Sequence, residues 1–324
     1  LREGVDFPRL GLVITDEQHR FGVGQRAALA AKGGQGLHPH VLVMSATPIP
    51  RTLALLMYGD LDVSILDELP PGREKVDTFL VGESYRARIN AFIRKQVAEG
   101  HQCFVVCPAV EENSDLGIKA AAAWAETLQK TVFPDLRIAL LHGQMRGDEK
   151  ESVMASFARQ EADVLVATTV IEVGVDVPNA TLMVIEDADR FGLSQLHQLR
   201  GRVGRGSSKS YCILTTHNRN PDTIARLKAL CKTNDGFRIA EEDLKLRGPG
   251  DFFGSRQSGL PAFRMADLSF DLELLKQAQE ASAQWIDRCG TQDTPEANAL
   301  RQRVGQLFQR AQRFRQKASG AADI

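Results

Sequence analysis

Two acidic residues near the start of the chain follow a short apolar run and could carry metal chemistry. Residues 12–14 are apolar, and Asp16 and Glu17 come two positions after them. The carboxyl ends of parallel strands are where α/β sheets bind ligands. In an enzyme that hydrolyses a nucleoside triphosphate, the first carboxylate would hold Mg²⁺ and the second would orient the attacking water. Taken alone, the pair fits a strand that ends in a polar turn equally well.

Two hydroxyl side chains follow a second apolar run. Ser45 and Thr47 come directly after residues 41–44, in the order Ser-Ala-Thr. Hydroxyl groups at a neighbouring strand end can hydrogen-bond an acidic site across the sheet. An acidic pair on one strand and Ser-Ala-Thr on the next occur together by chance far less often than either alone, so we interpret them as one site.

A third group of chemically active residues is a stretch rich in Gly and Arg. Arg202 and Arg205 stand three residues apart within it, hence on one face if the stretch is helical. A planar guanidinium suits the charge that spreads over a γ-phosphoryl group during its transfer. The alternative is a basic helix bound to a phosphate backbone.

The predicted strands and helices that must position these residues alternate regularly along the chain. Short apolar runs alternate with helical patterns, which predicts an α/β fold with parallel sheets. The predicted strands lie at residues 12–14, 41–44, 104–106, 138–141, 164–166 and 182–185, and the predicted helices at residues 86–99, 118–130 and 148–159. Two amphipathic helical patterns follow, at residues 268–285 and 304–314.

A Pro-Pro-Gly sequence at residues 70–72 breaks any regular element and predicts an interdomain linker. Only a few strands precede it, too few for a complete doubly wound domain. We therefore expect a partial α/β domain at residues 1–72, a complete parallel-sheet domain at residues 73–220, and a helical C-terminal region at residues 221–324.

Composition indicates a globular chain without a membrane span. Of 324 residues, 43% are hydrophobic and 25% charged, and no run of about 18 apolar residues occurs. The net charge is −1, yet residues 190–256 hold 13 Lys and Arg against 6 Asp and Glu. Five cysteines without a repeated pair spacing favour reduced core thiols over a zinc knuckle.

The motifs and their order resemble superfamily 2 helicases. Residues 16–19 (Asp-Glu-Gln-His) and 45–47 are similar to the family's motifs II and III, and residues 167–176 and 198–205 to its motifs V and VI. Residues 141–145 resemble its His-Gly segment. The resemblance implies two RecA-like domains, the first partial here and the second complete.

Within superfamily 2, the longer sequences around motifs II and III are similar to those of two families, the RecG family and the transcription-repair coupling factors. Gln18, where coupling factors usually have Glu, favours the RecG family, as do residues 58–62 and 67–73. Both families share a translocation motif, which residues 236–259 resemble. That motif is a helical hairpin and loop that couples the ATP cycle to movement on duplex DNA.

The resemblance assigns a role to each candidate residue. Asp16 would hold Mg²⁺ and Glu17 would orient the attacking water. Arg202 and Arg205 would bind the γ-phosphoryl group. Three residues would bind the nucleotide: Gly174, Asp176 and Gln198. The residues that contact DNA or couple it to the nucleotide would be His19, Ser45, Thr47, His142, Gly143, Thr168, Arg247, Arg256 and Gln257.

The function that the resemblance implies is ATP-dependent translocation on branched duplex DNA, with fork reversal and Holliday junction branch migration in DNA repair and recombination. Its cofactors would be ATP and Mg²⁺, and its partners replication forks, Holliday junctions and a single-strand-binding protein. We expect a monomer in the bacterial cytoplasm, associated with the nucleoid.

The phosphate-binding loop Gly-x-x-x-x-Gly-Lys-Ser/Thr occurs nowhere in the sequence. We expect this loop and a DNA-splitting wedge domain to precede Leu1 in a longer protein, and the chain by itself to lack ATPase activity. Two alternatives stay open: a transcription-repair coupling factor, which would add RNA polymerase as a partner, and a DNA-binding module without catalysis.

Overall fold

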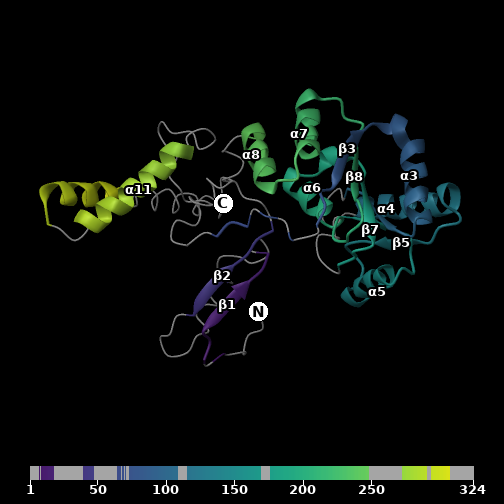
Figure 1. Ribbon diagram of the computed structural model, residues 1–324, viewed down its shortest axis with the longest axis horizontal. Helices are drawn as coiled ribbons and strands as arrows, with labels where there is room; N and C mark the ends of the chain where they lie inside the picture. The colour runs from purple at the N-terminus through teal and green to yellow at the C-terminus, as the bar shows by residue number, and fades with distance from the viewer. Residues whose placement is uncertain are drawn as a thin grey trace, which may run out of the picture. The chain divides into compact units, whose positions relative to one another are not determined.

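The computed structural model shows two parallel sheets and a set of helices (Figure 1). It describes residues 7, 9–17, 39–46, 64–66, 68, 70, 73–108, 115–168, 176–247, 272–289 and 293–306. These residues fall into two compact units, one within Leu1–Pro48 and Asp67–Ala240 and the other within Ile49–Leu66 and Glu241–Ile324. Among the described residues, no helix is long and apolar enough to cross a membrane.

The first sheet is a parallel pair made of β1 (Leu12–Thr15) and β2 (His40–Val43). Thr15 lies opposite Val43, and the amide of Met44 donates to the Thr15 carbonyl at 2.7 Å. The residues that follow the two strands therefore emerge at the same edge.

The second sheet has six parallel strands in the order β3-β8-β7-β4-β6-β5. Non-consecutive neighbours require helical crossovers, as in doubly wound α/β domains. The strands are β3 (Asp77–Val81), β4 (Gln102–Val106), β5 (Ile138–Leu141), β6 (Val164–Ala167), β7 (Ala180–Ile185) and β8 (Tyr211–Thr215). The helices of this domain are α3 (Arg86–Ala98), α4 (Asp115–Thr127), α5 (Gly147–Ala158), α6 (Leu193–Arg200) and α7 (Pro221–Lys232), with a π-helical turn at Leu128–Val132 and short 3₁₀ turns at Glu83–Tyr85 and Ala188–Arg190.

Two hydrophobic cores cover the two faces of this sheet. On β4, Cys103 and Val105 point into the core formed with α3 and α4, whereas Phe104 and Val106 point into the core formed with α5, α6 and α7. Because successive side chains of a strand point to opposite faces, a central strand covered on both sides must be apolar throughout. β6 and β7 meet this requirement, since every residue in them is buried.

The six strands predicted from apolar runs are all present, and each lies within two residues of its predicted bounds. The prediction missed β3 and β8, whose sequences mix Asp, Thr, Tyr and Cys with apolar residues. These two strands pair with each other, and β3 lies at the edge of the sheet, where continuous apolarity is not required. Their β-branched and aromatic residues were the available signal.

The helix α7 illustrates how the sequence sets an element's start. The side chain of Asn220 accepts a hydrogen bond from the amide of Asp222 at 2.8 Å, and Pro221 occupies the first helical position. Both residues are favoured there, because the cap satisfies a free amide and proline has none to satisfy.

The C-terminal part of the described chain is helical. It contains α8 (Gly236–Arg247), α11 (Leu272–Cys289) and a helix at residues 295–306. The predicted helix at residues 268–285 therefore corresponds to α11, and the last predicted pattern lies partly outside the described residues.

Candidate functional site

The acidic pair lies where the sequence predicted, directly after β1. The amide of Glu17 donates to Oδ1 of Asp16 at 2.8 Å, and Glu17 has a φ of 51°. A non-glycine residue in the left-handed region costs free energy, and such residues cluster at functional sites. Ser45 follows β2 at the same sheet edge, so the structure brings Asp16, Glu17 and Ser45 to one end of the strand pair. His19 and Thr47 lie outside the described residues.

The donor set at this edge fits Mg²⁺ bound together with a nucleotide. Mg²⁺ is usually held by one or two carboxylates, with substrate phosphates and water completing its octahedron. Asp16 and Glu17 supply two carboxylates, and no group of three or more His, Cys, Asp or Glu side chains that could hold a metal occurs in the described part of the chain. The two carboxylates at this edge would hold Mg²⁺, with phosphate and water oxygens as its other ligands.

The arginine stretch is a turn, so the condition under which Arg202 and Arg205 would share a helix face is not met. α6 ends at Arg200, and Gly201 caps it. Gly204 then has a φ of 74°, which favours glycine and reverses the chain. A Cβ atom on Gly206 would lie 2.6 Å from the carbonyl oxygen of Pro178, so this glycine permits a close backbone approach. The two arginines are consequently placed by a glycine turn.

Arg205 lies against a predicted nucleotide-binding residue. Its Nη1 is 3.3 Å from Oδ1 of Asp176, and its Nε donates to the carbonyl of Gly201 at 3.1 Å. Asp176 and Arg205 are 29 residues apart in sequence, so the fold brings together two residues that the motifs had assigned separately. Gln198 lies on α6 in the same segment, whereas Gly174 falls outside the described residues.

A third arginine in this segment has a structural role that the sequence did not reveal. Arg200 is 3% exposed, and its Nη1 donates to the carbonyls of Leu230 and Thr233 at 2.7 and 2.9 Å. Its Nη2 lies 3.0 Å from Nδ1 of His197. Because a guanidinium can only donate, this Nδ1 accepts and the neutral imidazole carries its proton on Nε2. Burial, and then the charge of Arg200, lower the pKa of His197 to about 4.

The predicted nucleic-acid residues His142, Gly143 and Thr168 also meet at one edge. β5 and β6 are neighbours with Leu141 opposite Ala167, so His142 and Thr168 follow directly at their carboxyl ends. The amide of Thr168 donates to the carbonyl of Leu141 at 3.1 Å. Nδ1 of His142 is buried and has no hydrogen-bond partner in the described structure.

Lys150 on α5 holds the His-Gly turn and was not predicted. Its Nζ donates to the carbonyl of Gly143 at 2.7 Å. A lysine one helix turn into α5 carried no sequence signal that would separate it from an ordinary surface lysine.

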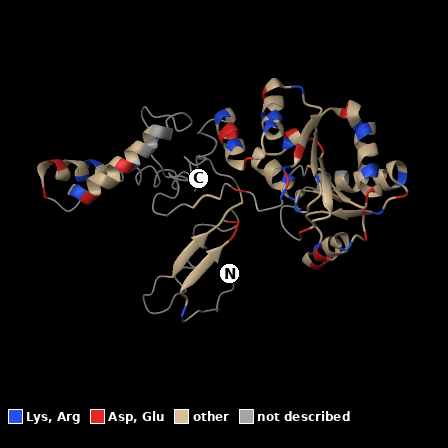
Figure 2. Ribbon diagram, in the orientation of Figure 1, with Lys and Arg blue, Asp and Glu red and all other residues tan. Residues whose placement is uncertain are grey.

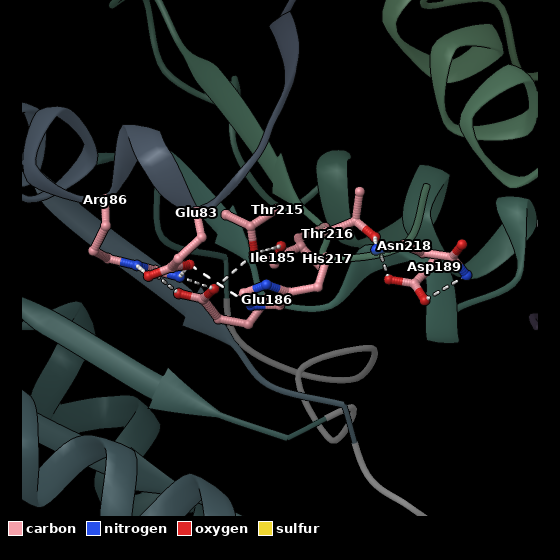
Figure 3. Close-up of polar contacts among 9 residues, drawn as sticks. All are labelled: Glu83, Arg86, Ile185, Glu186, Asp189, Thr215, Thr216, His217 and Asn218. Carbon is pink, nitrogen blue, oxygen red and sulfur yellow. Dashed lines mark hydrogen bonds and ion pairs between the residues drawn. The ribbon is translucent and has the colours of Figure 1, made fainter. Parts of the chain in front are cut away.

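A polar network lies at the carboxyl ends of β7 and β8 and was likewise missed (Figure 3). Arg86, the first residue of α3, binds Glu186 through two hydrogen bonds of 2.6 and 2.8 Å and Glu83 through two of 2.9 Å. Thr215 donates to Glu186 at 2.7 Å. The hydrogen bond to Glu186 raises the pKa of Arg86, and Arg86 lowers the pKa of Glu83. The network ties α3 to two strand ends, which fixes this edge of the sheet.

Comparison with known proteins decides the family. The Helicase conserved C-terminal domain matches residues 85–207, and the C-terminal part of domain 3 of the ATP-dependent DNA helicase RecG matches residues 233–314. A Synechocystis protein named ATP-dependent DNA helicase RecG is 55% identical over 282 residues, covering 87% of this chain and 34% of the relative. A Bacillus subtilis protein of the same name is 47% identical over 301 residues, covering 93% and 44%.

A solved structure of RecG bound to a three-way DNA junction matches with a TM-score of 0.64 and 47% identity, over 85% of this chain and 34% of that one. The chain belongs to the RecG family. It spans between a third and a half of the length of the two relatives described above.

The RecG domain 3 match begins at residue 233, between α7 and α8. Arg226 on α7 donates to the carbonyls of Asp189 and Phe191 at 2.7 and 3.0 Å, which anchors this helix to the strand-end region of Figure 3. α8 ends at Arg247, whose side chain is not described, and Arg256 and Gln257 lie outside the described residues.

Much of the positive charge in residues 190–256 of this RecG-family chain is engaged within the protein. Figure 2 shows Lys and Arg interspersed with Asp and Glu on the helices. Six of the 13 basic residues bind carboxylates or backbone carbonyls: Arg200, Arg205, Lys209, Arg226, Arg238 and Lys245. The local excess of charge therefore does not by itself define a DNA-binding surface.

Proposed function

We propose that this chain supplies the arginine turn and the DNA-tracking elements of an ATP-driven translocase that acts on branched duplex DNA. The observation that carries the proposal is the pairing of Arg205 with Asp176, because it joins two ATPase motifs in a chain of the RecG family. The relative whose structure was solved with a three-way DNA junction supports branched DNA as the substrate.

Hydrolysis would use both groups of residues described above. Asp16 would hold Mg²⁺, which neutralises phosphate charge, and Glu17 would orient the attacking water. Arg202 and Arg205 would bind the γ-phosphoryl oxygens, where negative charge develops as the terminal P–O bond breaks. Gln198, Gly174 and Asp176 would contact the nucleotide, and Arg205 would exchange Asp176 for a phosphate oxygen.

DNA would be held at the carboxyl edge of the six-stranded sheet. Backbone N–H groups of His142 and Gly143 and the side-chain hydroxyl of Thr168 would meet the phosphates, since such groups suit sequence-independent contacts. The nucleotide state would be coupled to these DNA contacts by Ser45, Thr47 and His19. The segment with Arg247, Arg256 and Gln257 would couple the ATP cycle to movement along the duplex.

The wider setting belongs to the same proposal. Its DNA substrates would be replication forks and Holliday junctions, with a single-strand-binding protein as a further partner. A monomer in the bacterial cytoplasm, associated with the nucleoid, is the expected form.

The test is strand separation of a three-way DNA junction by the full-length protein that contains this sequence, with ATP and Mg²⁺. We expect the wild type to separate the strands and Glu17→Gln to bind the junction with unchanged affinity but without separating them. Equal strand separation by the wild type without ATP, or by Glu17→Gln with it, contradicts the proposal.

A further inference from the structure

The residues that directly follow the Pro-Pro-Gly linker lie against the arginine turn. Nη2 of Arg73 donates to the carbonyl oxygen of Gly201 at 3.3 Å, across 128 residues of sequence. The same carbonyl accepts from Nε of Arg205 at 3.1 Å. One oxygen atom thus joins an arginine beside the linker to an arginine assigned to ATP hydrolysis.

A second contact between the same two segments is independent of Arg73. Val76 is 7% exposed and belongs to the core that also contains Val203. A Cβ atom on Gly204 would lie 2.8 Å from Cγ2 of Val76 and 3.7 Å from the carbonyl oxygen of Glu74. The backbone at Gly204 therefore packs on residues 74–76 with no room for a side chain.

The charge of Arg73 also affects His197 in the last turn of α6. Burial and the charge of Arg200 are the main causes of the lowered pKa of His197, and Arg73 contributes in the same direction. This agrees with the hydrogen bond to the Gly201 carbonyl, which places the guanidinium of Arg73 beside the end of α6.

We infer that Arg73 is a positioning residue for the arginine turn, because it fixes the Gly201 carbonyl that in turn orients the guanidinium of Arg205. The role in hydrolysis rests on the proposed function. Without Arg73, the carbonyl keeps only Arg205 as a side-chain donor among the described residues, and the turn loses its tether to the post-linker segment. Arg73 does not touch the reacting atoms in this assignment, and it acts through Arg205.

The first measurement needs no ATPase activity. Hydrogen exchange of the amides of residues 201–203, which donate to carbonyls of α6, is compared between the 324-residue chain and its Arg73→Ala variant. We expect about tenfold faster exchange at these amides, the scale of one hydrogen bond from a charged donor. Exchange in β7 should stay unchanged. Equal exchange in the two proteins at residues 201–203 overturns the inference.

The matched control is Arg94→Ala on α3. Arg94 is also an exposed arginine, but it binds Asp135 and the carbonyl of Val132. It should leave exchange at residues 201–203 unaltered. If Arg94→Ala accelerates these amides as much as Arg73→Ala does, the effect is a general loosening of the domain and the inference is wrong.

The second measurement is junction-stimulated ATP turnover by the full-length protein. Arg73→Ala should lower kcat about tenfold, again the scale of one such hydrogen bond, and leave KM for ATP and the Kd for junction DNA within about twofold. An Arg205→Lys background lacks the Nε donor to Gly201. In that background, Arg73→Ala should lower kcat by less than about twofold, because the effects of substituting residues that act as one unit are non-additive.

These results separate the inference from the proposed function. An unchanged kcat in Arg73→Ala, or an equal tenfold fall in both backgrounds, overturns the positioning role. Absence of ATP turnover in the wild-type protein overturns the proposed function, and the hydrogen-exchange result on the 324-residue chain still decides whether Arg73 shapes the turn.

Discussion

At the scale of single residues, two arginines five positions apart, Arg200 and Arg205, have different surroundings and hence different roles. Arg200 is buried and binds backbone carbonyls, whereas Arg205 is partly exposed and pairs with Asp176. Removing a buried donor leaves its acceptors unsatisfied, whereas removing an exposed ion-pair partner costs little.

We therefore predict that Arg200→Ala destabilises the chain by about 3 kcal/mol, because the carbonyls of Leu230 and Thr233 lose their shared donor. Arg205→Ala, the matched control, should cost less than about 1 kcal/mol. Urea unfolding of the 324-residue chain measures both. Equal destabilisation by the two changes would mean that Arg200 does not anchor α6 to the end of α7.

His197 predicts a pH dependence of stability. Its pKa in the folded chain is about 4, below the ordinary value of 6.5, so the unfolded chain binds the proton more readily. Stability should therefore fall as the pH drops from about 6.5 towards 4, by at most about 3 kcal/mol, and this contribution should be constant above pH 7.

The measurement is urea unfolding at several pH values between 7 and 4.5, a window in which most carboxylates stay ionised. His197→Asn, whose side-chain oxygen keeps an acceptor for Arg200, should flatten the slope in this window. A slope that persists in His197→Asn would assign the pH dependence to other groups.

The sequence pointed to residues whose type suits phosphate chemistry, but not to residues whose role depends on tertiary contacts. Asp16, Glu17 and Arg205 stay predicted site residues, chosen because their spacing and residue type point to phosphate chemistry. Arg200 and Lys150 were missed because their roles depend on which carbonyls the fold brings to them. No local pattern encodes a contact across 30 residues of sequence, such as that between Arg200 and Leu230.

At the scale of elements, the turn after α6 determines where Arg202 and Arg205 lie. Gly204 combines a φ of 74° with direct packing on Val76, so two independent costs oppose any side chain there. The helical spacing considered for Arg202 and Arg205 does not apply, because α6 ends at Arg200 and Gly201 and Gly204 stand on either side of Arg202.

Gly204→Ala should destabilise the chain by about 2 kcal/mol, from backbone strain and overpacking together. Gly147→Ala at the first position of α5 is the control, because nothing lies within 4 Å of a Cβ atom there and its φ is not positive. Thermal unfolding of both variants measures the difference. A Gly204→Ala variant as stable as Gly147→Ala would show that the turn tolerates another shape.

Strands were easier to predict than turns or edge elements. Fully buried strands such as β6 and β7 appear as continuous apolar runs, and this is a physical requirement of a sheet covered on both faces. β3 and β8 carry polar residues, and their pairing could be identified only once the fold had placed them side by side.

At the scale of the whole molecule, we expect the helicase motifs to determine DNA binding more than the local excess of positive charge does. Six of the 13 basic residues in residues 190–256 are paired within the protein, among them Arg205, Lys209 and Lys245, each with a carboxylate. DNA affinity should consequently depend on the strand-end residues and the C-terminal segment, and the arginine turn should serve the nucleotide.

The most direct test of this account is junction-stimulated ATP turnover by the full-length protein with Arg205→Ala, measured together with its affinity for a three-way junction. Because the lost contact forms mainly in the transition state, we predict a fall in kcat of about 10³, with the Kd for DNA within about twofold of the wild type. Wild-type turnover combined with weakened DNA binding would contradict the account and assign Arg205 to the phosphate backbone of DNA.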